Sequence, residues 1–129
     1  INLIVKGCNY GWPDVEGKSD QPDEQDFCTR HDVAEPLVSW SPTIAPSGMD
    51  YYQGDLIPQW KNSLLLAVLK NSVLLQLPLN ASQDRIGEPR EFLKNEYGRL
   101  RDICIGPDGK VYVSTDNGQD RILVISPAN

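Results

Sequence analysis

The segment Leu-Leu-Leu-Ala-Val-Leu-Lys-Asn-Ser-Val-Leu-Leu-Gln-Leu, residues 64–77, decides how the second half of the chain folds. Two apolar runs, 64–69 and 72–77, flank the polar dipeptide Lys70-Asn71. Each run is too short to make a convincing helix, and two short apolar runs joined by a polar dipeptide are typical of a β-hairpin. The sequence therefore predicts two antiparallel strands here.

The same pattern recurs 47 residues further along, from Leu64 to Val111, where residues 110–115 and 121–126 predict a second hairpin. Another strand candidate precedes each hairpin, at 48–52 and at 100–105. Short strands repeated at a spacing in the forties are typical of propeller blades, whose twisted sheets bury their faces by stacking. We therefore expect an all-β fold of β-propeller blades, with a small β-sandwich as the alternative, and no helix.

The size of the chain limits how many blades it can form. Its 129 residues suffice for one ordinary domain, or about two to three blades, which cannot close a ring. The chain also begins at Ile1, without Met or a targeting leader. We expect a fragment of a longer chain, with an apolar flank covered by missing blades or by a second copy in a homodimer. No transmembrane segment is expected, because the longest apolar run is only 64–69.

Acidic residues gather in one segment of the chain. The net charge is −6, and residues 14–35 hold eight acidic and two basic side chains. This balance argues against a nucleic-acid partner, which needs a basic surface. The segment has few apolar residues, so we interpret residues 14–35 as an exposed acidic loop. A calcium site is the less favoured alternative, with carboxylates of Asp20, Asp23, Glu24 and Asp26 as ligands.

The three cysteines allow two interpretations. A disulfide between Cys8 and Cys28 would close a loop of about twenty residues and imply an oxidising compartment. Alternatively, all three thiols are free. Cys104 lies between Ile103 and Ile105 and is predicted to be a small buried residue.

The sequence shows no complete active site. The single histidine, His31, lies in the acidic segment and is expected at the surface, and no known nucleophile or phosphate-loop motif is present. In a strand, Arg99 and Arg101 would share one face, about 7 Å apart, and could bind a ligand with several carboxylates. The alternative is that they pair with protein acids such as Asp102. Lys70 adds a cation at the first hairpin.

Four motifs follow one another along the chain: Asn9-Tyr10-Gly11-Trp12-Pro13, the segment 42–48, the strand 60–70, and Arg99-Leu100-Arg101-Asp102 with Gly106-Pro107-Asp108-Gly109. Together they resemble the glucose/sorbosone dehydrogenase family of soluble quinoproteins, which use pyrroloquinoline quinone (PQQ). The resemblance covers nearly the whole chain except the acidic segment. It implies a six-bladed β-propeller, of which residues 1–129 would be the C-terminal blades.

The resemblance also implies roles for individual residues. Lys70, Arg99 and Arg101 would hold the carboxylates and quinone oxygens of PQQ, and Trp40 would line the site of a sugar substrate. The parent protein would then be a PQQ-dependent oxidoreductase acting on aldose sugars, located in the periplasm or secreted.

This chain departs from the family pattern in what it lacks. The family's catalytic histidine and the ligands of its calcium ion lie in earlier blades, and no residue here matches them. We therefore expect calcium only in the parent protein, and no activity from this chain alone. Two alternatives remain: a cofactor-less propeller module that binds carbohydrate or protein partners, and a structural domain whose basic residues only pair with nearby acids.

Overall fold

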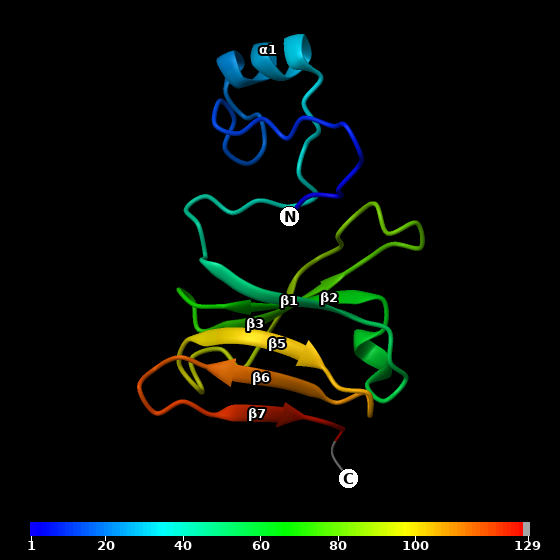
Figure 1. The fold of residues 1–129 in the computed structure, drawn as a ribbon, viewed down its shortest axis with the longest axis vertical. Helices are drawn as coiled ribbons and strands as arrows, with labels where there is room; N and C mark the ends of the chain where they lie inside the picture. Colours follow the sequence, from blue (N-terminus) through cyan, green and yellow to red (C-terminus); the bar gives the residue numbers. More distant parts are fainter. Residues whose placement is uncertain (128–129) are drawn as a thin grey trace. The chain divides into compact units, whose positions relative to one another are not determined.

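The computed structural model describes residues 1–127. These residues fold as two compact units, Ile1–Thr43 and a second unit that begins at Ile44. Figure 1 shows that the first unit carries the only helix longer than one turn in this part of the chain, while the strands lie in the second unit.

The first unit contains helix α1, Pro22–His31, in the segment predicted to be a loop. Pro22 occupies the first turn, the side chain of Glu24 accepts a hydrogen bond from the Gln21 backbone at 3.1 Å, and Asp32 ends the helix with a φ of 48°. These local features are typical of residues at which a helix begins and ends. No residue of α1 is buried, so the prediction of exposure is confirmed for the helix, whereas Val15, earlier in the acidic segment, is buried at 5% exposure. The prediction of an irregular loop is wrong for Pro22–His31.

The structure resolves the cysteine alternatives. Cys8, Cys28 and Cys104 are all free thiols. Cys104 is exposed, so the prediction that it is buried is wrong. Because neighbouring residues of a strand face opposite sides of the sheet, Ile103 is buried at 5% exposure while Cys104 faces outward.

The acidic segment shows no metal centre. Within residues 1–127, no three His, Cys, Asp or Glu side chains are grouped so that they could hold a metal ion. The calcium alternative for residues 14–35 therefore finds no support.

Within residues 1–127, no helix has both the length and the apolar character needed to cross a membrane.

Four antiparallel strands form the first sheet of the second unit, in the order β1-β2-β3-β4. The predicted hairpin is confirmed, with Leu66 of β2 opposite Leu75 of β3. Strand β4 and the short 3-10 helix η1 were not predicted. The bounds of these elements are Pro46–Tyr52 for β1, Pro58–Trp60 for η1, Ser63–Val68 for β2, Val73–Pro78 for β3 and Arg90–Phe92 for β4.

Three antiparallel strands form the second sheet, in the order β5-β6-β7. Their bounds are Leu100–Ile105, Val111–Thr115 and Ile122–Ile125. The predicted strand at 100–105 and the predicted second hairpin are both confirmed. One face of β7 is exposed, with Ile122 at 66% and Val124 at 54% exposure, so an apolar flank of the kind expected is present.

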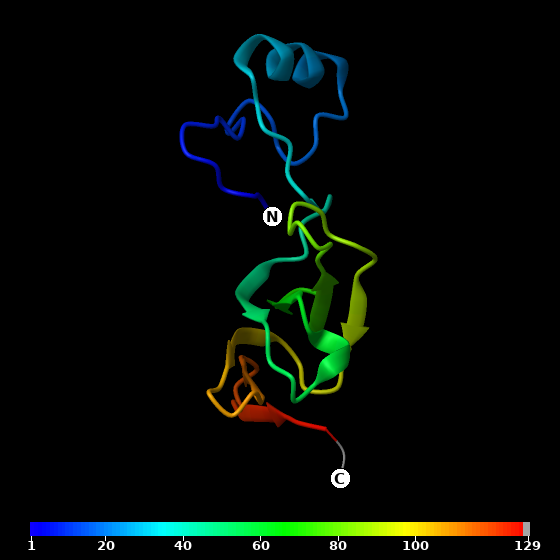
Figure 2. The ribbon, with the colours of Figure 1, turned by 90° about the vertical axis from the view of Figure 1, so that its right-hand side faces the viewer.

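The two sheets stack through their first strands, β1 and β5, which lie side by side in Figures 1 and 2. A Cβ atom added to Gly48 of β1 would lie 2.8 Å from the Cα of Asp102 in β5, so only glycine allows this approach. A shared core fills the space between the sheets. It comprises Tyr52, Ile57, Trp60, Leu65, Ala67, Leu74, Leu100, Ile103, Val111 and Val113.

Candidate functional site

The hydroxyl group of a serine near the start of β1 connects the first sheet to the first strand of the second sheet, β5. Ser47 lies where the register of β1 shifts against β2, in a bulge between Pro46 and Gly48. Its Oγ is 2.8 Å from the carbonyl oxygen of Leu100 in β5 and 3.0 Å from that of Ala67 in β2, and its proton is shared between these acceptors. The start of β5 is thereby held against the end of β2.

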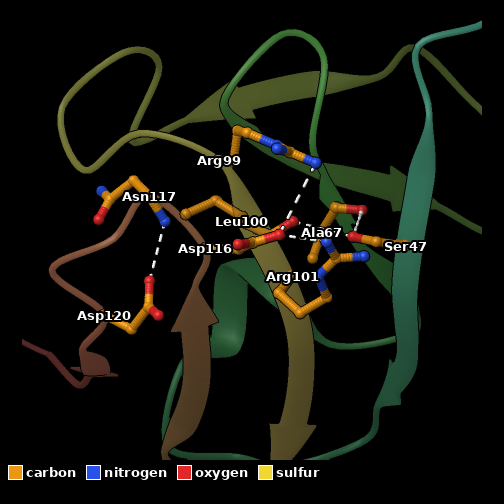
Figure 3. A network of polar contacts seen from close by, with 8 residues as sticks. All are labelled: Ser47, Ala67, Arg99, Leu100, Arg101, Asp116, Asn117 and Asp120. Atoms are coloured by element: carbon orange, nitrogen blue, oxygen red, sulfur yellow. Dashed lines mark hydrogen bonds and ion pairs between the residues drawn. The ribbon is translucent and has the colours of Figure 1, made fainter.

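Arg101 occupies a second bulge, at the start of β5. Leu100 pairs with Thr115 and Asp102 pairs with Ser114, so Arg101 has no partner residue of its own on β6. Its guanidinium group donates a hydrogen bond to the carboxylate of Asp116, which directly follows β6. The bulge thus turns the side chain toward Asp116 (Figure 3).

Arg99 reaches the same carboxylate from the other side of Leu100. Its Nη2 lies 3.7 Å from Oδ2 of Asp116, the oxygen that also accepts from Arg101. The side chains of Arg99 and Arg101 are 54% and 50% exposed, and that of Asp116 is 35% exposed. Two guanidinium groups therefore share one carboxylate, as Figure 3 shows. Their exposed fractions leave part of each arginine side chain open to solvent.

Asp116 is negatively charged in this arrangement. The hydrogen bond from Arg101 is the largest effect and lowers the pKa of its carboxyl group from the usual 3.8. Burial opposes this as the second-largest effect, and the positive charges of Arg101 and then Arg99 lower the pKa further. The three charges sum to +1, because two guanidinium groups face one carboxylate.

Lys70 lies at the same end of the sheets as the arginines. It is in the turn between β2 and β3, and the end of β2 is opposite the start of β1, with Val68 facing Pro46. Ser47 connects that end to the start of β5. Lys70 is exposed, and its amino group forms no hydrogen bond or ion pair within the described residues.

Trp40 lies elsewhere in the chain. It is half-buried in the first unit, outside any helix or strand. The structure therefore brings Arg99 and Arg101 together on one carboxylate and places Lys70 at the same end of the second unit, whereas Trp40 belongs to the other unit.

Sequence reasoning missed Asp116 as the partner of the arginines. The suggested partner, Asp102, instead accepts a hydrogen bond from the backbone of Ile103 at 2.9 Å. Hairpin register could have indicated Asp116, because the end of β6 lies opposite the start of β5. A polar surface pocket of about 370 Å³ adjoins this region, lined by Glu96, Tyr97, Gly98, Asn117, Gln119 and Arg121.

Two curated relatives show what this chain is similar to. The aldose sugar dehydrogenase YliI of Escherichia coli is 32% identical over 100% of this chain and 35% of its own length. The quinoprotein glucose dehydrogenase B of Acinetobacter calcoaceticus is 27% identical over 90% of this chain and 36% of its own length. The chain thus spans about a third of the length of these relatives.

A solved structure agrees with both the fold and the sequence. The PQQ-bound form of an aldose sugar dehydrogenase from Streptomyces coelicolor matches 97% of this chain and 35% of its own, with 32% identity and a TM-score of 0.70. The predicted propeller blades are confirmed, and the described residues form two of them. A family model described as Glucose / Sorbosone dehydrogenase matches residues 1–124. The chain therefore belongs to the glucose/sorbosone dehydrogenase family.

Proposed function

We propose that this chain is part of a PQQ-dependent dehydrogenase that oxidises aldose sugars, and that Lys70, Arg99 and Arg101 bind the cofactor. The observation that carries the proposal is the convergence of two half-exposed arginines on one carboxylate, which leaves a net positive charge. The names of the relatives, a quinoprotein and a PQQ-bound aldose sugar dehydrogenase, support it.

The residues present fit the chemistry of PQQ, which carries three carboxylates and an ortho-quinone. A guanidinium group has five N–H donors in a planar fork that matches a carboxylate, and Asp116 uses only part of this capacity in Arg99 and Arg101. Lys70 supplies a compact positive charge at the same end of the sheets. When bound, PQQ would accept the two electrons that leave the sugar.

The remaining parts of the catalytic site are proposed to come from the rest of the parent protein. His31 ends α1 and packs against the ring of Phe27, with the ring centroids 4.3 Å apart. It therefore has a structural partner, and we do not assign it the role of catalytic base. The base and the calcium ligands are proposed to lie in other blades, and Trp40 to contact the sugar.

The exposed flank of β7 is proposed to be covered by other blades of the parent chain. The relatives are about three times as long as the part that this chain matches, which favours missing blades over a homodimer. We also propose a periplasmic or secreted location, in keeping with the family resemblance.

The proposal is tested by titrating PQQ into the intact parent protein and into its Arg101→Ala variant, with binding followed by calorimetry. We expect the variant to bind at least tenfold more weakly, because a charge-assisted, bidentate contact is lost. Lys61→Ala is the matched control, since Lys61 pairs with Asp55 away from the site at 2.6 Å. Equal affinities in all three proteins would show that Arg101 does not hold the cofactor.

The alternative is a cofactor-less module that binds carbohydrate or protein. The same titration separates it from the enzyme, because such a module would show no PQQ binding in the parent protein. The coding sequence upstream of Ile1 provides a second criterion. The absence of both the catalytic histidine and the calcium-binding loop would favour the binding module.

A further inference from the structure

We propose that Asp116 is a positioning residue of the cofactor site, whose carboxylate holds Arg99 and Arg101 in the arrangement that receives an anionic ligand. This inference rests on the proposed function and assigns a role to a residue that does not itself need to touch the cofactor.

The first support is the geometry of the two ion pairs. Both guanidinium groups approach the same oxygen, Oδ2 of Asp116, from residues on either side of Leu100. Long side chains at exposed positions otherwise sample many rotamers, and ordering them on binding opposes affinity. A shared carboxylate reduces this disorder before the ligand arrives.

The second support is that Asp116 is itself held firmly. Its backbone N–H donates to the carbonyl oxygen of Arg99 at 2.8 Å, which fixes the main chain of Asp116 beside that of Arg99. The next residue, Asn117, is also held in place: its backbone N–H donates a hydrogen bond to the carboxylate of Asp120 at 2.8 Å (Figure 3). The side chain of Asn117 also donates to the carbonyl oxygen of Tyr97 at 2.7 Å.

These contacts connect the turn after β6 to the segment that leads into β5. A Cβ atom on Gly98, which has a φ of 74°, would lie 2.6 Å from Nδ2 of Asn117, so the two segments are closely packed. Movement of Asp116 would have to disturb this packing. The main chain that carries the carboxylate is therefore fixed, and the short Asp116 side chain gives the longer arginine side chains a partner in one place.

The third support comes from charge. Without the carboxylate, two like charges would face each other and separate. With it, the cluster retains a charge of +1, to which Lys70 adds another at the same end of the sheets. The remaining positive charge attracts a polycarboxylate, while the carboxylate of Asp116 offsets the repulsion between the two arginines.

Removal of Asp116 has two opposing effects on an anionic ligand. The site becomes more positive, which favours binding, but the arginines lose their anchor. All three side chains are at least one-third exposed, and salt screens charges at exposed positions over about 8 Å at physiological ionic strength. We therefore expect the loss of positioning to dominate, and the affinity to fall.

The test uses the intact parent protein and measures PQQ binding without sugar turnover. We compare the wild type with Asp116→Asn, Asp116→Glu and Asp108→Asn at low and high salt. Asp108 is the matched control, because its carboxylate also pairs with a cation, Lys110 at 3.2 Å, but lies in the turn between β5 and β6.

Asp116→Asn is expected to bind PQQ about tenfold more weakly, in line with the loss of one charge-assisted contact, and with a steeper dependence on salt because its site is more positive. Asp116→Glu should recover most of the affinity, and Asp108→Asn should match the wild type. If Asp116→Asn does not fold, Asp116→Ser replaces it.

Unchanged or tighter binding by Asp116→Asn, or by Asp116→Ser in its place, would overturn the inference and show that the carboxylate only competes with the ligand. Equal losses in Asp116→Asn, Asp116→Glu and Asp108→Asn would also overturn it, since they indicate a general structural effect. Failure of the proposed function looks different: the wild type does not bind PQQ, or Arg101→Ala binds as tightly as the wild type.

Discussion

At the scale of single residues, the hydroxyl group of Tyr52 joins parts of the chain that are distant in sequence. The side chain is fully buried. Its hydroxyl accepts a hydrogen bond from the backbone of Ile57 and donates one to the carbonyl oxygen of Gly109, each at 2.9 Å. One phenol thus connects the end of β1 to η1 and to the turn between β5 and β6.

We predict that Tyr52→Phe lowers the free energy of unfolding by about 2 kcal/mol, because it leaves a buried donor and a carbonyl without their partner. Urea unfolding provides the measurement. Tyr112→Phe is the control, since the Tyr112 hydroxyl makes only an exposed contact of 3.3 Å with Asp108. Equal losses in the two variants would contradict the role given to Tyr52.

Gly48→Ala is predicted to destabilise the second unit by about 1–3 kcal/mol, the usual cost of overpacking. The new methyl group would lie 2.3 Å from Oδ1 of Asp102 and 2.8 Å from its Cα, so β1 and β5 would have to separate. Gly87→Ala should be close to neutral, because its Cβ would meet nothing nearer than 3.5 Å. Urea unfolding of both variants tests the difference.

The ion pairs of Asp116 predict a dependence of stability on pH. Because its pKa is lowered in the folded chain, its contribution is present above the unfolded value near 3.8 and is lost as the pH falls through the folded value. The difference in unfolding free energy between the wild type and Asp116→Asn should therefore be constant near neutral pH and shrink below 3.8. A difference that grows on acidification would contradict this.

At the scale of elements, the sequence predicted the strands that carry apolar residues and missed those that do not. The two hairpins and the strands before them were found because short apolar runs and turn residues mark them. Strand β4 has only three residues, two of them charged and exposed, so no hydrophobic pattern identifies it. Its pairing with β3 depends on the tertiary structure.

Helix α1 was missed for a different reason. It has no buried face, so hydrophobic periodicity gives no signal. Local interactions stabilise it instead, including the contacts of Glu24 at its start and the pair between Arg30 and Asp26 at 2.8 Å. The residues that make these contacts can be read in the sequence, but they indicate a helix less strongly than the acidic composition of the segment indicates a loop.

The candidate site was predictable only in part. The sequence identified Arg99 and Arg101 and assumed that regular alternation would place them on one face. The bulge at Arg101 interrupts that alternation, and a bulge arises from pairing between strands rather than from local sequence. Their convergence is instead achieved through Asp116, from a segment that follows β6.

At the scale of the whole molecule, residues 1–127 form two blades and a further unit that carries helix α1, and the chain spans about a third of the length of its relatives. We predict that the isolated 129-residue chain will not oxidise sugars, even with PQQ and calcium added. Sugar oxidation needs a base beside the reacting hydroxyl, and no such base is assigned within the chain.

A dye-reduction assay with aldose sugars measures this directly, with the intact parent protein as the positive control. PQQ-dependent reduction by the isolated chain would contradict the prediction, and would require that a base within residues 1–129 be identified.

The half-exposed arginine pair also has a practical consequence for how this protein is handled. Citrate and phosphate are multivalent anions that suit guanidinium groups, so buffers made from them would compete with any carboxylate-bearing ligand. Weakly coordinating buffers with chloride as the main anion leave Arg99 and Arg101 accessible, and affinities measured in the two kinds of solution should not be compared directly.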